Sequence, residues 1–293
     1  MTQPVSSEEN SNRYVIDAED ATEMARLLDQ DKQMTGSMGG IFSERSENDL
    51  ANIHRVLDLA CGPGGWVNEV SNAFPTMNVI GVDLSDKMIG YARAYAEVRK
   101  LANASFKVMD VTKPLDFADE SFDLVNARCI FAFMSPQGWA SLLAECKRIL
   151  RPGGVIRLTE GEWGVGTSPA YETYLGYFFK AMQLAGRSFS ATGQHVGITP
   201  VLGHMLRDAG FEHIQKKAHV HDFSYGEEAH PGFTFDLTLL FKLLQPFITR
   251  TGVATQAQLD TLYEKVQQEM RSEEFCALAY YLTVWGEKPN NGS

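Results

Sequence analysis

The sequence is poor in cysteine and contains no long apolar run. Its four cysteines are Cys61, Cys129, Cys146 and Cys276, and no two of them form a CxxC pair. We therefore predict neither a zinc site nor a disulfide framework, and unpaired thiols are typical of a cytoplasmic protein. No stretch of 18 apolar residues is present and the first residues are polar, so neither a membrane-spanning helix nor a signal peptide is expected.

Positive charge is also scarce. The chain of 293 residues has 26 Lys and Arg against 37 Asp and Glu, which gives a formal net charge of −11. Proteins that bind nucleic acid usually present a basic face, so a nucleic-acid partner is not expected. A hydrophobic content of 44% is enough for a globular core, and the length predicts one or two domains.

Short apolar runs recur along the chain, with helical patterns between them. The runs cover residues 55–60, 78–84, 105–111, 122–128 and 154–160. Nearly continuous apolar runs of this length are typical of strands buried on both faces of a parallel sheet. The alternation of strands and helices predicts a doubly wound α/β sheet with right-handed crossovers.

An amphipathic helix is predicted before the first strand, over residues 17–34. Ala21, Met24, Ala25 and Leu28 recur at helical spacing there, so they are expected to face inward.

The part of the chain after the fifth strand departs from simple alternation. Thr199 is predicted to cap a helix that ends at Gly210, and helical patterns fill two insertions. We expect polar tails at residues 1–12 and 289–293. The predicted division is a helical cap (1–50), a Rossmann-like core (51–225) with a helical insertion (168–186), a helical lid (226–274), and a final strand with its tail (275–293).

Polar side chains lie at or near the end of each predicted strand. They are Asp58, Asp83, Asp110, Asn126 and Glu160. The carboxyl ends of parallel strands meet at one rim of the sheet, where open α/β sheets bind their ligands. Several polar groups at one rim predict a polar ligand site.

The glycines after the first strand narrow the kind of ligand. Gly62 and Gly64 lack side chains and would let a ligand approach the backbone closely. Val67 stands where the dinucleotide fingerprint requires a third glycine, and no Gly-Lys-Ser/Thr sequence follows for a triphosphate. Asp83 ends the next strand, where an acid can accept hydrogen bonds from ribose hydroxyls. The pattern favours an adenosyl ligand and weakens, without removing, the alternative of a nicotinamide dehydrogenase.

Four segments resemble, in order, the motifs of class I S-adenosylmethionine-dependent methyltransferases, most closely the small-molecule branch. They are "VLDLACGPGGW", "VIGVDLSDKMI", "VMDVTKPLDFADESFDLVNAR" and "ILRPGGVIRLTE". The resemblance covers about residues 50–225. It implies a mostly parallel seven-stranded sheet whose last strand is antiparallel, with residues 214–223 and 276–288 as the last two strands.

The resemblance also implies S-adenosyl-L-methionine as the cofactor and a role for each matching position. The methionine part would face Asp58, Ala60, Cys61, Gly62 and Gly64. The ribose and adenine would contact Asp83, Leu84, Met88, Asp110 and Val111, and Asn126 would line the reaction chamber.

The expected reaction is in-line methyl transfer, which depends mainly on the positioning of the two reactants. A general base is needed only if the acceptor must lose a proton. His195, Glu162 and Tyr14 are the candidates for such a base, with His221 as a further one. For each of these residues a purely structural role is the alternative.

Aromatic residues are expected to shape the acceptor site. Phe131, Phe133 and Trp163 follow the fourth and fifth strands, and both helical insertions are rich in aromatic residues. They predict a lid over a medium-sized, fairly hydrophobic small molecule, although many of these side chains could simply pack helix on helix. Two other functions stay open: an enzyme that uses the cofactor without methyl transfer, and a non-catalytic cofactor-binding subunit. A homodimer also remains open.

Overall fold

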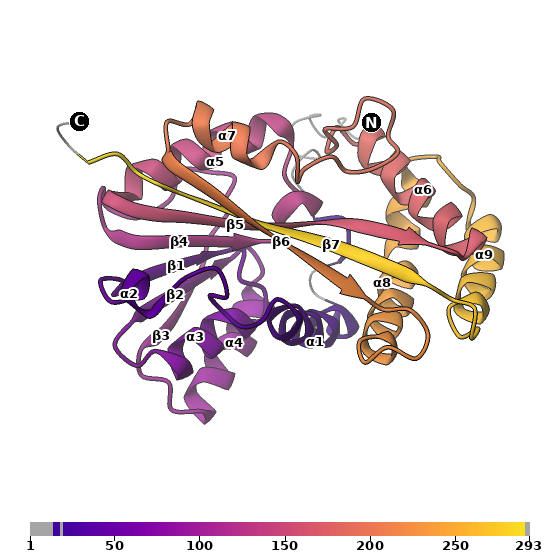
Figure 1. Ribbon diagram of the computed structural model, residues 1–293, viewed down its shortest axis with the longest axis horizontal. Coiled ribbons are helices and arrows are strands. Elements are labelled where there is room, and N and C mark those ends of the chain that lie inside the picture. The colour runs from indigo at the N-terminus through magenta and orange to yellow at the C-terminus, as the bar shows by residue number, and fades with distance from the viewer. Residues whose placement is uncertain (1–13, 18–19, 291–293) are drawn as a thin grey trace, which may run out of the picture.

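The strands of the described residues form one mixed seven-stranded sheet with helices on both faces (Figure 1). The computed structural model describes residues 14–17 and 20–290. The strand order is β3-β2-β1-β4-β5-β7-β6, and β7 runs antiparallel to both of its neighbours. The predicted fold class is confirmed, including the antiparallel last strand. The predicted tail at residues 1–12, and residues 291–293 of the other tail, lie outside the described residues.

Each apolar run of the sequence corresponds to a strand. The strands are β1 (Arg55–Leu59), β2 (Asn78–Asp83), β3 (Ala104–Val108), β4 (Phe122–Arg128), β5 (Leu150–Gly166), β6 (Glu212–Asp222) and β7 (Ala277–Glu287). β5 extends beyond the predicted run at both ends. It begins early because Leu150 already pairs with Phe122 of β4, and it ends late because its second half continues to pair with β7 after β4 has ended.

The helices lie on both faces of the sheet and beyond one end of it. They are α1 (Ala21–Ser37), α2 (Glu47–Leu50), α3 (Gly65–Ala73), α4 (Asp86–Val98), α5 (Pro136–Ile149), α6 (Pro169–Leu184), α7 (Leu202–Asp208), α8 (His230–Arg250) and α9 (Gln256–Glu269). In Figure 1, α5 and α7 cover one face, and α1, α3 and α4 cover the other. The helices α6, α8 and α9 lie together near the carboxyl end of β5 and the amino end of β7.

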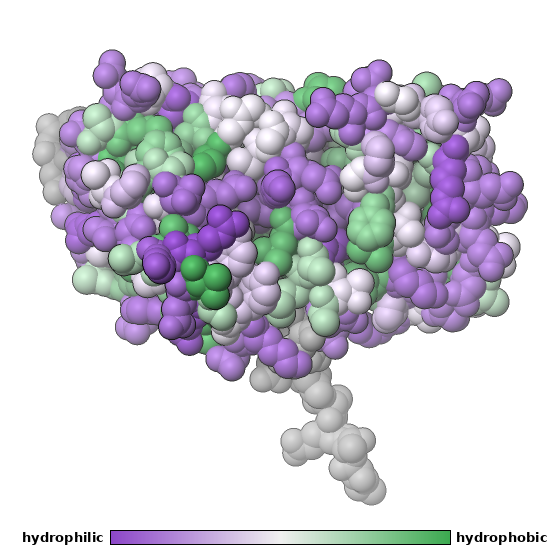
Figure 2. All heavy atoms as spheres, turned by 90° about the horizontal axis from the view of Figure 1, so that it is seen from below, coloured by the Kyte–Doolittle hydropathy of each residue, from purple (hydrophilic) through white to green (hydrophobic). Residues whose placement is uncertain are grey.

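The surface is mixed in polarity. On the face shown in Figure 2, hydrophobic residues appear in separate areas between hydrophilic ones. Within the described residues, no helix combines the length and the hydrophobicity needed to cross a membrane.

The helix α1 buries a different face from the one that hydrophobic spacing predicted. Ala21 and Ala25 are exposed, whereas Glu23 and Arg26 are almost completely buried. Hydrophobic periodicity fails here because the buried stripe of α1 carries charged side chains that form ion pairs with each other and with α8.

The predicted cap at Thr199 is also wrong. α7 begins at Leu202, and its N-cap residue Val201 makes no side-chain capping bond. The backbone N–H of Thr199 instead donates to Glu162 Oε1 over 3.4 Å, so this residue belongs to the loop that precedes the helix.

The position of α3 on the sheet depends on two glycines. Gly64 is the N-cap of α3 with φ +80°, and a Cβ there would lie 2.7 Å from Phe106 Cε1 and 2.8 Å from Ala92 Cβ. Gly81 on β2 leaves space for Val67, since a Cβ on Gly81 would lie 3.0 Å from Val67 Cγ2. In the dinucleotide fingerprint, the third glycine lies on the helix and allows it to pack closely on the sheet. Here Val67 occupies that position, and Gly81 on β2 provides the space instead.

We expect Gly64→Ala to lower the free energy of unfolding by about 1–3 kcal/mol, because alanine is strained at positive φ and its methyl group would collide with Phe106. Gly176→Ala is the matched control. Gly176 lies on the exposed face of α6 with free space around it, so alanine should raise stability there by about 0.5–1 kcal/mol. Urea unfolding of both variants measures the difference, and equal stabilities would refute the packing role of Gly64.

Candidate functional site

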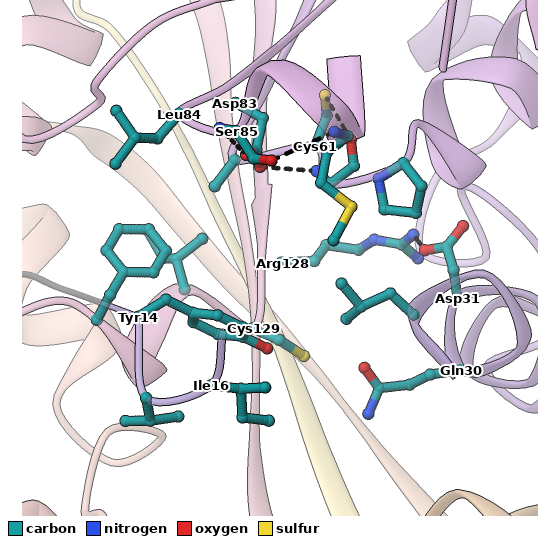
Figure 3. Close-up of a pocket in the computed structure, with 18 of the residues that line it drawn as sticks. Tyr14, Ile16, Gln30, Asp31, Cys61, Asp83, Leu84, Ser85, Arg128 and Cys129 are labelled. Carbon is teal, nitrogen blue, oxygen red and sulfur yellow. Dashed lines mark hydrogen bonds and ion pairs between the residues drawn. The ribbon is translucent and has the colours of Figure 1, made fainter. Parts of the chain in front are cut away.

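A cavity of about 890 Å³ lies at the carboxyl ends of β1, β2 and β4. Its floor comes from the residues that end these strands, and its walls come from residues 14–17, α1 and α8 (Figure 3). The predicted cofactor residues that line it are Asp58, Ala60, Cys61, Gly62, Asp83, Leu84, Met88, Asp110 and Val111. Its size is at the upper end of the range of about 300–1,000 Å³ typical of small-molecule sites.

Asp83 organises the loop that follows β1. Its Oδ2 accepts a hydrogen bond from the backbone N–H of Gly62 over 2.9 Å, and its Oδ1 accepts one from Ser85 over 2.9 Å (Figure 3). Burial raises the pKa of the Asp83 carboxyl, while these backbone donors lower it. The carboxylate thus links the ends of β1 and β2 and presents its remaining lone pairs to the cavity.

Asp58 is the first of a row of buried polar groups that crosses the sheet. Asn126 Nδ2 donates to Asp58 Oδ1 over 2.7 Å, and Arg157 Nη1 donates to Asn126 Oδ1 over 2.8 Å. Arg157 Nε in turn donates to Glu44 Oε1 over 2.6 Å. Asp58, Asn126 and Arg157 are paired in register on β1, β4 and β5, which explains why their side chains meet.

The structure corrects the position predicted for Asn126. This residue is completely buried and does not line the cavity, because its amide is occupied by Asp58 and Arg157. It holds Asp58 in place instead of contacting a ligand. The other oxygen of Asp58 accepts no hydrogen bond from a described residue, so it is available to the cavity that Asp58 lines.

Burial changes the ionisation of Asp58. Removal of the carboxyl from water raises its pKa from 3.8 to about 7, against the opposing effects of the Asn126 amide and the Arg157 charge. A cation that bound beside Asp58 would favour its ionised form.

Asp110 follows β3 and has one free oxygen. Its Oδ1 accepts from the backbone N–H of Thr112 over 2.9 Å and from the Thr112 hydroxyl over 2.7 Å. Its Oδ2 accepts from no described residue, and Asp110 lines the cavity. Asp110 is therefore a fixed acceptor for a ligand N–H or O–H group.

The roles of the two glycines differ. Gly62 lines the cavity with φ +53°, and the nearest atom to a Cβ there would be Leu27 Cδ1 at 3.7 Å. Gly62 is therefore open to a ligand. Gly64 packs against Phe106 and Ala92 and does not line the cavity, so its predicted contact with the cofactor is corrected to a packing role.

One wall of the cavity is the polar side of α1. Asp31 forms an ion pair with Arg128 at the end of β4, and Arg128 Nη1 donates to Thr35 Oγ1 over 3.0 Å (Figure 3). Burial, together with the charge of Arg157, lowers the pKa of Arg128 to about 9. A Cβ on Gly65 would clash with the Asp31 carboxylate, so this glycine lets α1 approach the start of α3.

A buried ion-pair network joins α1 to α8. Arg26 Nε donates to Glu23 Oε2 over 2.7 Å, and Arg26 Nη1 donates to Asp236 Oδ1 over 2.9 Å. The Tyr14 hydroxyl donates to Glu23 Oε1 over 2.9 Å. The network holds the segment at Tyr14, α1 and α8 together over the cavity. Hydrophobic patterns could not reveal it, because all of its members are polar.

The helix α8 reaches the cavity through Lys242, Leu243, Pro246 and Arg250. Three of these positions are four residues apart, so they share one face of the helix. The predicted aromatic lid is corrected here: Tyr174 and Phe241, for example, stack on each other with ring centroids 4.2 Å apart and line no part of the cavity. Phe178 of the first insertion stacks on Trp163 of β5, and Phe233 of the second stacks on Phe223.

The candidate bases are dispersed. His195 is exposed, Glu162 accepts a hydrogen bond from the Thr199 backbone, and neither lines the cavity. Tyr14 does line it, but its hydroxyl donates to Glu23, and burial raises its pKa well above 10. His221 is buried in β6, with Nε2 3.3 Å from Ser37 Oγ.

Glu160, predicted to end the fifth strand, lies inside β5 and has a structural role. Glu160 Oε1 accepts from the backbone N–H of Ile130 over 2.9 Å and does not line the cavity. Burial raises its pKa to about 8. The predicted substrate residues divide between two places: Phe133 lines the large cavity, whereas Phe131 and Trp163 line a smaller neighbouring one.

The comparisons with known proteins agree with this geometry. Residues 56–154, which span β1 to the start of β5, match a family model described as a methyltransferase domain. The match covers the strands whose ends carry Asp58, Asp83 and Asp110, and the sheet has the seven strands and the antiparallel last strand that the resemblance implies. This part of the chain is similar to methyltransferase domains.

Two relatives show how far this similarity extends. The chain is 29% identical over 182 residues to phosphoethanolamine N-methyltransferase 3 of Arabidopsis thaliana, and the alignment covers 61% of this chain and 33% of that protein. It is 29% identical over 192 residues to demethylmenaquinone methyltransferase of Lactiplantibacillus plantarum, which covers 61% of this chain and 78% of that protein. The chain thus spans about a third of the length of the plant relative and most of the bacterial one.

A solved structure supports the fold. The YcgJ protein from Bacillus subtilis superimposes with a TM-score of 0.50 at 19% identity, over 82% of this chain and 93% of YcgJ.

The ionisation of Asp58 predicts a dependence of stability on pH. The folded pKa of about 7 lies above the ordinary value of 3.8, so between these values the folded state holds a proton that the unfolded state has lost. The contribution of Asp58 to stability is therefore complete below pH 3.8 and is lost as the pH rises through about 7. We expect Asp58→Asn to remove this loss, and urea unfolding of both proteins from pH 5 to 8 tests it. Parallel pH profiles of the two proteins would contradict the assignment.

Proposed function

We propose that the protein transfers a methyl group from S-adenosyl-L-methionine to a medium-sized, fairly hydrophobic small molecule. The observation that carries the proposal is that three carboxyl groups, those of Asp58, Asp83 and Asp110, line one cavity beside the open backbone of Gly62. Carboxylates suit a ligand that combines positive charge with hydroxyl and amine donors.

The chemistry of these groups fits the proposed cofactor. Asp83 would accept from the ribose hydroxyls, and the free oxygen of Asp110 would accept from the adenine amine. The buried side chain of Met88 and the exposed side chain of Leu84 would contact the adenine. Asp58 would lie beside the positively charged methionine part.

S-adenosylmethionine, when bound, supplies a methyl group that is already activated by its positive sulfur. The protein then needs to fix the reactants and exclude water, which can account for much of the acceleration. Asn126 and Arg157 hold the Asp58 carboxyl in one orientation, and the Arg26 network closes α1 and α8 over the cavity. None of the three candidate bases is free at the cavity, so we propose that positioning dominates.

The known activities named for two relatives support a small acceptor. One is a phosphoethanolamine methyltransferase and the other a demethylmenaquinone methyltransferase, so small molecules of different polarity are methylated by relatives of this chain. The net charge of −11 argues against a nucleic-acid acceptor. The four free cysteines favour a cytoplasmic location.

The first test is cofactor binding, with Asp110→Asn as the variant. The amide can still accept from Thr112, but it places a donor where the adenine amine would require an acceptor. We expect calorimetry to show S-adenosylhomocysteine binding about tenfold more weakly, the loss of one hydrogen bond to a charged group. Asp116→Asn, an exposed acid outside the cavity, is the control and should bind like wild type. Equal affinity of both variants would refute the role of Asp110.

The second test is turnover. Incubation with methyl-labelled cofactor and a metabolite extract should yield S-adenosylhomocysteine together with label in small molecules. Cofactor consumption without S-adenosylhomocysteine would favour the enzyme that uses the cofactor differently, and binding without any product would favour the non-catalytic subunit. Label found in macromolecules alone would contradict the proposed acceptor class.

A further inference from the structure

The buried row that runs from Glu44 through Arg157 and Asn126 to Asp58 contains two acids but one cation. Arg157 is paired with Glu44, and the two side chains are only 1% and 0% exposed. Asp58 is also buried, and its described hydrogen-bond partner is the neutral amide of Asn126. Since no ion pair joins Asp58 to a described residue, the row is one positive charge short when both of its acids are ionised.

The unpaired oxygen of Asp58 meets the large cavity. Asn126 Nδ2 donates to Oδ1, whereas Oδ2 accepts from no described residue. Oδ2 is not enclosed by the protein, and Asp58 lines the cavity, so Oδ2 is the atom that a ligand can reach. A carboxylate in so buried a position is costly to ionise without a positive partner, and the cavity has room for one.

The other ionisable groups on the elements around Asp58 do not supply this charge. Asp83 of β2 is itself an acid, and Cys61 stays a neutral thiol because burial raises its pKa. Arg128 at the end of β4 pairs with Asp31 of α1. Burial, with a smaller contribution from Asp83, therefore raises the pKa of Asp58 to about 7.

Arg157 acts on Asp58 indirectly, and Glu44 opposes that action. The Arg157 guanidinium donates to Asn126 Oδ1 over 2.8 Å, and its charge lowers the pKa of Asp58 against the larger effect of burial. Glu44, from the loop between α1 and α2, offsets the charge of Arg157 at 2.6 Å. Neither Glu44 nor Arg157 lines the cavity, so both can influence a ligand only through Asp58.

We propose that Asp58 binds the ammonium group of the cofactor's amino-acid part, and that Glu44 and Arg157 are positioning residues that fix the orientation and the charge of its carboxyl. The ammonium supplies the positive charge that the row lacks. Its binding ionises Asp58, whose proton passes to the solvent. This inference rests on the proposed function and adds the partner of Asp58 and two remote residues that control it.

The first experiment measures binding of S-adenosylhomocysteine, which carries the ammonium but no positive sulfur. Calorimetry of the full chain in two buffers of different ionisation enthalpy counts the protons released. Asp58 is mostly protonated at pH 6 and mostly ionised at pH 8, so we expect nearly one proton to leave at pH 6 and almost none at pH 8. The affinity should rise about tenfold between these pH values. Binding without proton release at pH 6 overturns the proposal.

A matched ligand isolates the ammonium. The probe 4-(5′-adenosylthio)butyrate is S-adenosylhomocysteine without its amino group. It should bind more weakly, release no proton at pH 6 and gain no affinity from pH 6 to pH 8, because it offers Asp58 no positive partner. Proton release equal to that of S-adenosylhomocysteine would show that Asp58 does not meet the ammonium.

The variant Asp58→Asn tests which acid releases the proton. Its binding of S-adenosylhomocysteine should be weaker than that of wild type and equal at pH 6 and pH 8. A pH dependence that persists in Asp58→Asn would assign the titration to another acid, such as Asp83, and would contradict the proposal.

Two variants of the row should shift the midpoint of the pH profile in opposite directions. In Glu44→Gln the side chain can still accept from Arg157 but no longer offsets its charge, so the midpoint should fall by at least about 0.5 pH unit. The double variant Glu44→Gln/Arg157→Gln removes both charges and leaves none unpaired, so the midpoint should rise. A purely structural role would weaken binding without these opposite shifts.

Glu44→Asp keeps the charge and should restore the wild-type midpoint. Glu47→Gln, which changes an exposed acid of α2, is the matched control and should leave the profile unchanged. If Glu44→Gln does not fold, the double variant carries the test. A wild-type midpoint in either folded variant refutes the role of the two remote residues.

The outcomes separate the two proposals. Failure of S-adenosylhomocysteine to bind at either pH would refute the proposed function itself. If it binds equally well at pH 6 and pH 8 without releasing a proton, the role of Asp58 as the partner of the ammonium is refuted and the proposed function is not.

Discussion

The part of the sheet that faces the cavity is held together by one buried row of hydrogen-bonded polar side chains. The row consists of Asp58, Asn126, Arg157 and Glu44. Strand register places three of them side by side on β1, β4 and β5, and Glu44 pairs with Arg157 from the loop before α2. Arg157 is completely buried, so loss of either charge would leave the other unpaired inside the protein, which is strongly destabilising. The row therefore joins the sheet, the loop that covers it and the Asp58 carboxyl that faces the cavity.

A second buried network closes the same cavity from the opposite side. Arg26 on α1 and Asp236 on α8 are 210 residues apart in the sequence, and their ion pair holds the two helices together. Neither helix belongs to the core α/β pattern, yet both supply cavity walls, Asp31 from α1 and Lys242 from α8. The α/β core thus supplies Asp58, Asp83 and Asp110 to the cavity, and α1 and α8 supply the rest of its walls.

The sequence predicted the sheet well, because buried strands leave continuous apolar runs and strand ends leave polar residues. Most of the polar residues predicted at the rim do line the cavity. Asn126 and Glu160 do not, since spacing cannot show that a neighbouring side chain or backbone group already occupies them. The buried face of α1 was mispredicted because its interior positions are charged. The contributions of α8 could not be found from pattern, because Lys242 and Arg250 look like ordinary surface residues until the fold brings them to the cavity.

The measurement that tests the central claim most directly is a crystal structure of the protein with S-adenosylhomocysteine. The account predicts that the adenosine lies between Asp83 and Asp110, with the amino-acid part beside Asp58. It also predicts that the sulfur is directed towards Cys129 and Ile16, which line the same cavity. Density for the ligand outside this cavity, or an adenosine that contacts neither Asp83 nor Asp110, would contradict it.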